Sequence, residues 1–398
     1  MRTVRSMLPS LLVMAALLGL AACQLLPLGQ AAPTPTPPPP LLPTATRPPL
    51  VPTPEPTQPS PQATPAPALA AGEIVFVRAG NLWAIGADGS NERPLTAYAS
   101  DTVLRDLVPS SDGHALAFTL DGHTLAIYDF AEGQIAVLDT ANDALIAAPV
   151  WLPEGGVAYQ RVPLDPQTMA PAVGEVWLAA SDAPPRPLIS AGALPEDPQA
   201  TFAPAFALSG GRLMVAAAPA EGEAPPRFLI YDPSGGVLIP LAAPGLEAPA
   251  VWDVSPDGAK VLLYEQTAPN VLYLADLNPD GSAANIVQIS PPDERAYRLA
   301  HFAPDGARVL ALRAPLPESG EGVEALLMTP AAGGAYTITV LHQDVGFNYL
   351  MLRWHGEDGV VLQRMSTDGG DSELWLAPPD GSAGMFLTSG EQPVVVGG

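Results

Sequence analysis

The stretch VWDVSPDGAKVLLYEQTAPNVLYLADLNPDGSAANIVQIS, residues 251–290, contains four short apolar runs separated by turns. Its first and third turns are Ser255-Pro256-Asp257-Gly258 and Asn278-Pro279-Asp280-Gly281. Proline presets φ at the second position of a turn and glycine accepts positive φ, so each turn ends one strand and begins the next. Four strands in about 40 residues is the size of one blade of a β-propeller.

The same unit recurs along the chain from Gly72 onward. The turn after the first strand reappears as SSDG (110–113), PEGG (153–156), LSGG (208–211), SPDG (255–258), APDG (303–306) and GEDG (356–359). Each third strand begins with an apolar residue, namely Leu82, Leu125, Val176, Leu229, Leu272, Leu326 and Leu374. These positions are 43, 51, 53, 43, 54 and 48 residues apart. Such periods are typical of propellers, and a proline or glycine every 8–12 residues leaves no room for the helices of an α-solenoid.

The pattern contains seven second, third and fourth strands but only six first strands. The run Pro393-Val394-Val395-Val396, after the last fourth strand, is placed to supply the missing strand beside Ile74-Val75-Phe76-Val77. We therefore predict an all-β chain, a single β-propeller of seven four-stranded antiparallel blades, closed by pairing of the C-terminal strand with the N-terminal blade. The long stretch from Gln160 to Trp177 leaves six to eight blades open.

The N-terminus has the parts of a bacterial export signal. Arg2 and Arg5 precede an apolar run, and Leu20-Ala21-Ala22-Cys23 resembles the lipobox of bacterial lipoproteins, which implies lipidation of Cys23. The alternatives are an ordinary signal peptide with a chance cysteine and an uncleaved signal anchor. We expect a signal peptide at 1–22 and a protein held by lipid on the extracytoplasmic face of the cell membrane, or on an outer membrane where the organism has one.

Residues 24–71 contain 17 prolines in 48 residues and few apolar side chains. Such a tract cannot bury enough surface to offset its ordering entropy, so we expect a disordered Pro/Thr-rich stalk over 23–71. Extended as polyproline II it would reach up to roughly 150 Å. The predicted domains are thus the signal (1–22), the lipidated stalk (23–71) and the propeller (72–398).

The net charge and the cysteine content limit the classes of partner and of metal site that the chain can have. The formal net charge is −24 with a single lysine, Lys260, which argues against nucleic acid because phosphate contacts need clustered Lys or Arg. Cys23 is the sole cysteine, so neither an intrachain disulfide framework nor a multi-cysteine metal site can form. We expect a monomer whose partners are the membrane, through the N-terminal lipid, and a protein, peptide or glycan.

The segments GNLWAIGADGSNERPLT and WDVSPDGAKVLLYE resemble the TolB-like, WD-type propeller repeat. The resemblance extends from Gly72 to the C-terminus and is strongest at 73–97 and 251–290. It implies a propeller used mostly for binding, without implying a particular partner, because many functions share this fold. A Pro-rich tract stands where TolB has a small helical domain.

Two regions are candidates for function. In a propeller the first–second and third–fourth turns lie on one face, and here they are short and repetitive. The opposite face carries long, irregular loops, which makes it the candidate binding face; these loops are Val162–Gly174, Ala191–Gln199, Pro219–Pro226, Pro315–Gly322 and Ser366–Ser372. The first strands line the channel and supply the candidate ligand-binding residues Arg105, Asp253, His301, Arg353 and His355.

The sequence gives only weak support for a metal site or a catalytic site. His301 and His355 occupy similar positions in adjacent repeats, so a two-histidine metal or acid–base site is an alternative to ordinary channel histidines. Asp276, Asn278 and Asp280 match the first half of a calcium loop, but Ala284 and Val287 stand where its later oxygen ligands belong, so we predict a turn without Ca²⁺ and no cofactor. No linear catalytic motif occurs. A binding or scaffold module is favoured; the alternatives are a hydrolase or lyase using Asp253, His301 and His355, and a passive envelope protein.

Overall fold

The structure is a computed structural model that describes residues 68–219, 224–291, 295–315, 321–356 and 359–397. The predicted signal peptide, Cys23 and nearly all of the predicted stalk lie outside the described residues. So do the central parts of two candidate binding loops, 219–226 and 315–322.

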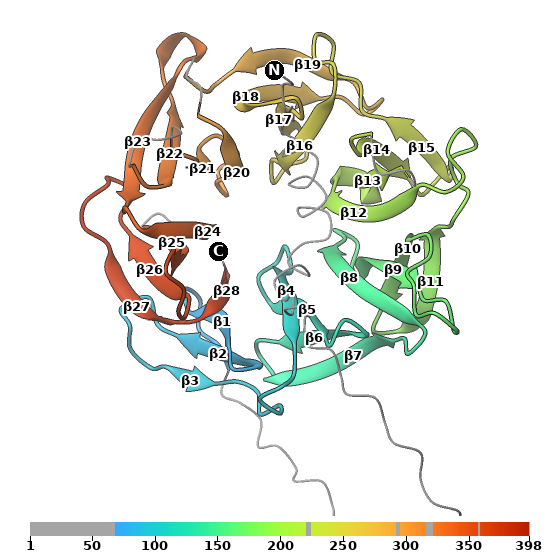
Figure 1. Cartoon of the computed structure of the whole chain (residues 1–398), viewed down its shortest axis with the longest axis horizontal. Helices are drawn as coiled ribbons and strands as arrows, with labels where there is room; N and C mark the ends of the chain where they lie inside the picture. Colours follow the sequence, from blue (N-terminus) through green and yellow to red (C-terminus); the bar gives the residue numbers. More distant parts are fainter. Residues whose placement is uncertain (1–67, 220–223, 292–294, 316–320, 357–358, 398) are drawn as a thin grey trace, which may run out of the picture.

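The described residues form seven four-stranded antiparallel sheets arranged as blades around a central axis (Figure 1). The predicted all-β propeller with seven blades is confirmed. Blade 1 consists of β28 (Glu391–Val395), β1 (Ile74–Arg78), β2 (Asn81–Ile85) and β3 (Arg93–Pro94). Blade 2 consists of β4 (Leu104–Pro109), β5 (Ala115–Leu120), β6 (Thr124–Asp129) and β7 (Gln134–Thr140). Blade 3 consists of β8 (Ala144–Trp151), β9 (Val157–Pro163), β10 (Glu175–Ala180) and β11 (Ala183–Ile189).

The remaining four blades follow the same order from the channel outward. Blade 4 consists of β12 (Thr201–Ala207), β13 (Leu213–Ala218), β14 (Arg227–Asp232) and β15 (Val237–Pro240). Blade 5 consists of β16 (Pro249–Val254), β17 (Lys260–Glu265), β18 (Ala268–Leu277) and β19 (Ala283–Gln288). Blade 6 consists of β20 (Tyr297–Phe302), β21 (Val309–Arg313), β22 (Glu324–Pro330) and β23 (Tyr336–Gln343). Blade 7 consists of β24 (Phe347–His355), β25 (Gly359–Ser366), β26 (Glu373–Ala377) and β27 (Met385–Ser389).

The turns that separate the strands are stabilised by their own side chains. In blade 5 the N–H of Gly258 donates to the carbonyl oxygen of Ser255 at 2.8 Å, and Gly258 has a φ of +70° that an L side chain rarely adopts. The carboxylate of Asp257 accepts hydrogen bonds from the Ser255 hydroxyl at 2.6 Å and from the N–H of Ala259 at 3.0 Å. The Ser-Pro-Asp-Gly sequence therefore encodes the turn locally, which explains why similar sequences recur between the first and second strands of the blades.

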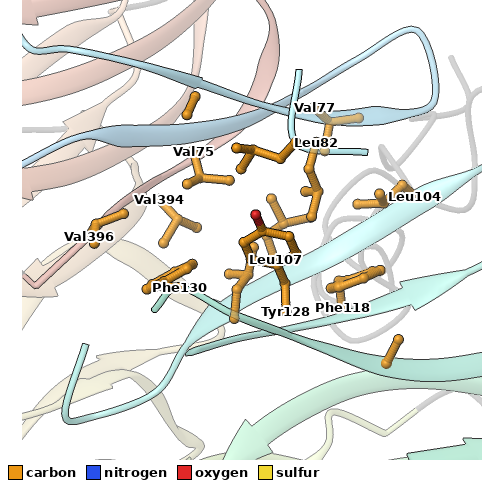
Figure 2. Packing of buried hydrophobic residues seen from close by; sticks show 14 residues of the cluster. Val75, Val77, Leu82, Leu104, Leu107, Phe118, Tyr128, Phe130, Val394 and Val396 are labelled. Atoms are coloured by element: carbon orange, nitrogen blue, oxygen red, sulfur yellow. The ribbon is translucent and has the colours of Figure 1, made fainter. Parts of the chain in front are cut away.

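The ring is closed by strands from the two ends of the described chain. β28 pairs antiparallel with β1, with Val394 opposite Val75, so the predicted closure is confirmed. The N–H of Val396 donates to the carbonyl oxygen of Glu73 at 2.9 Å, which extends the pairing. Figure 2 shows Val394 and Val396 among the buried apolar side chains that blades 1 and 2 contribute to one cluster, with Val75, Val77, Leu82, Leu104, Leu107, Phe118, Tyr128 and Phe130.

The stretch from Gln160 to Trp177 contains no additional blade. β9 ends at Pro163 and β10 begins at Glu175, so the residues between them form one second–third loop. The loop is ordered by Asp165, whose carboxylate accepts the N–H groups of Gln167 at 2.9 Å and Thr168 at 2.8 Å. Helix within the described ranges is limited to two 3₁₀ turns, η1 (Ser209–Gly211) and η2 (Ala332–Gly334), and neither has the length needed to cross a membrane.

The two faces of the ring differ, and we call them the turn face and the loop face. The turn face is formed by the first–second and third–fourth turns, and the loop face by the second–third and fourth–first connections. The chain enters the propeller on the turn face: the N–H of Leu69 donates to the carbonyl oxygen of Phe130, after the third strand of blade 2, at 3.0 Å. Nε2 of His355, in the first–second turn of blade 7, lies 2.7 Å from the carbonyl oxygen of Gly72.

Candidate functional site

Asp253, His301 and Arg353 occupy equivalent positions in the innermost strands of blades 5, 6 and 7. Each lies two residues before the residue that closes the first–second turn, where Ser255 pairs with Lys260, Ala303 with Arg308 and His355 with Gly359. The same position in blades 1 to 4 is apolar and is occupied by Val394, Val108, Val150 and Phe206. One ring of inner-strand positions, near the turn face, is therefore polar over three consecutive blades and apolar over four.

The three polar side chains form a chain of contacts across the blades. Oδ2 of Asp253 accepts the N–H of Phe302 at 2.8 Å and lies 3.4 Å from Nδ1 of His301. Nη1 of Arg353 lies 3.4 Å from Nε2 of His301 and donates to the carbonyl oxygen of Leu352 at 3.1 Å. A guanidinium only donates, so Nε2 of His301 is the acceptor and its proton is on Nδ1, facing Asp253. His301 thus lies between a carboxylate and a guanidinium.

Arg353 is the electrostatically unusual member of this chain. Removal from bulk water lowers the pKa of Arg353, although the Asp253 carboxylate opposes that shift, and the group stays protonated. Only Nη1 has a hydrogen-bond partner among the described residues, and Nε and Nη2 have none there. Most of the arginines that the structure describes are instead paired with carboxylates, such as Arg93 with Glu73. A desolvated cation thus keeps two donor groups without a protein partner within the described ranges.

Two of the predicted channel residues lie apart from this group. His355 is not the equivalent of His301: it closes the turn two residues beyond Arg353, and its Nε2 donates to Gly72. The predicted similarity of the two histidine positions is therefore wrong, because His355 closes its turn as Ala303 does, two residues beyond the position that His301 occupies. Arg105 pairs with Thr119 near the start of β4, toward the loop face.

Asp106, next to Arg105, is a further channel residue. It adopts a φ of +56° at the point where the β4–β5 register shifts, and its carboxylate accepts the Thr119 hydroxyl at 3.1 Å. Burial raises the pKa of Asp106, while this hydrogen bond and one from the Ala148 backbone act in the opposite direction. The carboxylate thus links blade 2 to blade 3, as Asp253 links blade 5 to blade 6.

The DLNPDG turn of blade 5 uses its oxygens internally. Asp276 accepts from Nζ of Lys260 at 2.9 Å and from Nδ2 of Asn285 at 2.7 Å. Asp280 accepts from both the N–H and the hydroxyl of Ser282. Asn278 donates from Nδ2 to the Ser282 hydroxyl, so the three side chains are engaged by the turn itself. Among the residues that the structure describes, no group of three or more His, Cys, Asp or Glu side chains is placed to hold a metal ion.

Exposed apolar side chains are distributed unevenly between the two faces. On the loop face Val345 is 72% exposed and Met169 is 59% exposed, and Val103, Leu145 and Leu350 lie at the same side. The other exposed large apolar residues belong to outermost strands, namely Ile135, Val137, Val237, Val287, Val340, Met385 and Phe386. None in the described ranges lies in a first–second or third–fourth turn. The loop face therefore has the apolar surface that the turn face lacks.

A polar and aromatic cluster joins the outermost strand of blade 6 to the first three strands of blade 7, and sequence patterns did not single it out. Nδ1 of His342 accepts the Tyr349 hydroxyl at 2.5 Å, and burial lowers the pKa of His342. Burial also raises the pKa of Tyr349 to about 12. Arg364 pairs with Asp344 and Glu373 and covers the ring of Trp375. The members come from four strands and the β23–β24 connection, so only the folded chain brings them together.

No protein-family model matches the chain, and no curated protein sequence matches it. Solved structures do resemble its fold. A prolyl endopeptidase is 14% identical with a TM-score of 0.56, and the match covers 81% of this chain and 50% of that one. The chain therefore spans about half the length of that endopeptidase. An oligogalacturonate lyase from Vibrio parahaemolyticus is 11% identical with a TM-score of 0.56, over 75% of this chain and 83% of that one.

A putative TolB from Agrobacterium tumefaciens is 11% identical with a TM-score of 0.42, over 80% of this chain and 90% of that one. Likeness at these identities extends to the fold alone. The class of protein is therefore a seven-bladed β-propeller. The narrower TolB-like assignment and the lipobox remain predictions from the sequence.

Proposed function

We propose that this protein is a membrane-anchored, extracytoplasmic propeller lipoprotein that binds a protein or peptide on its loop face. The proposal rests on one observation: the chain enters the propeller on one face, and the exposed apolar loop residues lie on the other. The chain leading from the predicted lipid anchor at Cys23 enters on the turn face, at Leu69, whereas the exposed apolar residues Met169 and Val345 lie on the loop face. A lipid-anchored propeller would thus carry its apolar loops on the face opposite the attachment of its stalk.

The chemistry of the loop face favours a protein or peptide over a glycan. Its exposed large apolar residues are aliphatic or methionine, and aromatic faces, on which sugar rings pack, are absent from that group in the described part of the face. Scattered single apolar residues are ordinary, but several on one face beside long loops are typical of protein contact surfaces. The net charge of −24 favours association with a cationic partner surface.

Fractionation of cells tests the anchor. Replacing Cys23 with alanine removes the predicted lipidation site, so the protein should move from the membrane fraction to the soluble extracytoplasmic fraction. A matched Ser6→Ala change within the signal segment should leave it in the membrane. Retention of the Cys23→Ala protein in the membrane would contradict lipid anchoring.

Site-specific photo-crosslinking in intact cells tests the binding face. A photoreactive residue at Met169 or Val345 should form an adduct with a discrete partner protein. The same residue at Ala259, which is exposed in a first–second turn on the turn face, is the matched control and should not form that adduct. Equal labelling from both faces, or labelling of neighbouring membrane proteins only, would refute a loop-face partner.

A further inference from the structure

The channel ring described above is more polar than its packing requires. Four blades place Val394, Val108, Val150 or Phe206 at this position, so apolar residues are compatible with the inner strand of a blade. Blades 5 to 7 replace them with Asp253, His301 and Arg353. Removing charged groups from bulk water is unfavourable unless partners replace the lost hydration, so the substitution calls for a reason other than stability.

The fold supplies hydrogen-bond partners that replace the lost hydration of Asp253, but the described part of it supplies no carboxylate partner for Arg353. Both carboxylate oxygens of Asp253 accept backbone N–H groups, from Phe302 and from Val254, each at 2.8 Å. Arg353 has no carboxylate within salt-bridge distance in the described residues, although the sequence holds 41 acidic residues against 17 Lys and Arg. Its Nε and Nη2 groups have no hydrogen-bond partner among the described residues and form the edge that a guanidinium uses for paired hydrogen bonds to an oxyanion.

We infer that the channel binds a small carboxylate anion near the turn face, through Nε and Nη2 of Arg353. His301 positions Arg353 through its 3.4 Å contact with Nη1, which leaves the other donors free. A single guanidinium edge fits one carboxylate, so the ligand is a small monocarboxylate. This inference goes beyond the proposed loop-face function and does not depend on it.

The charge of the protein favours a monoanion over phosphate. With a net charge of −24, the long-range field opposes a phosphate dianion about twice as strongly as a carboxylate. The Asp253 carboxylate, which contacts the same histidine, adds to that repulsion locally. A single bidentate pair with one guanidinium therefore suits a carboxylate best.

Saturation-transfer NMR with sodium butyrate as the probe, on the mature chain at pH 7 and low ionic strength, tests the site. We expect saturable binding that Arg353→Gln weakens by at least about tenfold, the effect of one charge-assisted hydrogen-bonded pair. Arg353→Lys keeps the charge but loses the paired N–H donors of the guanidinium, so its loss of affinity for butyrate should be intermediate. Arg298→Gln is the matched control, because Arg298 is an exposed arginine on the adjacent strand β20, and it should bind butyrate as the unaltered protein does.

Two comparison probes separate carboxylate recognition from other causes. Butanol, which has the apolar body without the charge, should not bind, and inorganic phosphate should bind more weakly than butyrate. The inference is overturned if butyrate shows no saturable binding, or if Arg353→Gln and Arg298→Gln bind it equally. Butanol binding as well as butyrate, or phosphate binding more tightly, overturns it too. Circular dichroism of each variant establishes that it is folded. If Arg353→Gln does not fold, Arg353→Lys replaces it as the test variant in the comparison with Arg298→Gln.

Discussion

Replacing Val394 with alanine measures how strongly the closing strand holds the ring. Val394 is 1% exposed, pairs with Val75 and packs in the cluster between blades 1 and 2 (Figure 2). Loss of two buried methyl groups, with the cavity they leave, should lower the free energy of unfolding by roughly 2–3 kcal/mol. For a domain of roughly 320 residues, whose unfolding entropy is about 0.7 kcal/mol per kelvin, Tm should fall by about 3–5 °C.

Urea unfolding followed by tryptophan fluorescence measures this loss, with the slope m checked for each variant. Val237→Ala is the matched control: Val237 is 51% exposed on the outermost strand β15, so its loss should stay within about 0.5 kcal/mol. If Val394→Ala loses no more than the control does, β28 does not belong to the native sheet. A changed m value would instead indicate that the ring opens before the remaining blades unfold.

Three further outcomes follow from particular contacts. Asp253→Ala leaves the N–H of Phe302 without its acceptor and should cost about 1–3 kcal/mol in urea unfolding; a neutral result would contradict the link between blades 5 and 6. Burial lowers the pKa of His342 below its ordinary value of 6.5, so stability should be level above about pH 6.5 and fall as the pH decreases below it. His342→Gln should flatten that fall between pH 7.5 and 5, and an unchanged profile would refute it. Gly381→Ala places a Cβ 2.6 Å from the carbonyl oxygen of Val340 and should lower Tm more than Gly369→Ala, which has similar positive φ but open space; equal losses would refute the clash.

The architecture could be predicted because its signals are local. The Ser-Pro-Asp-Gly turn of blade 5 is held by bonds among Ser255, Asp257, Gly258 and Ala259, all within five residues. Such a turn forms in any context that permits it, so its recurrence reveals the number of strands. The closing strand could also be predicted. The repeat pattern lacked one first strand, and an apolar run with no assigned partner followed the last repeat.

The arrangement of the channel residues could not be predicted, because it depends on register. In each of blades 5 to 7 the inner strand shifts register against its neighbour, for example between Val251 and Asp253. The strand pairing shows that the equivalent of His301 in blade 7 is Arg353, whereas His355 lies two residues further on, at the position of Ala303. A difference of one residue moves a side chain to the other face of a strand, and composition does not record it.

The entry of the chain on the turn face also separates the two sites that we propose. Arg353 lies two residues before a first–second turn, so its ring is close to the face on which Leu69 joins the propeller. Met169 and Val345 lie at the opposite ends of the strands. A small anion would therefore approach from the face to which the stalk attaches and a protein partner from the opposite face, so both could be bound at once. Coupling between them would require a change in the inner strands that connect the faces, because neither site shares a residue with the other.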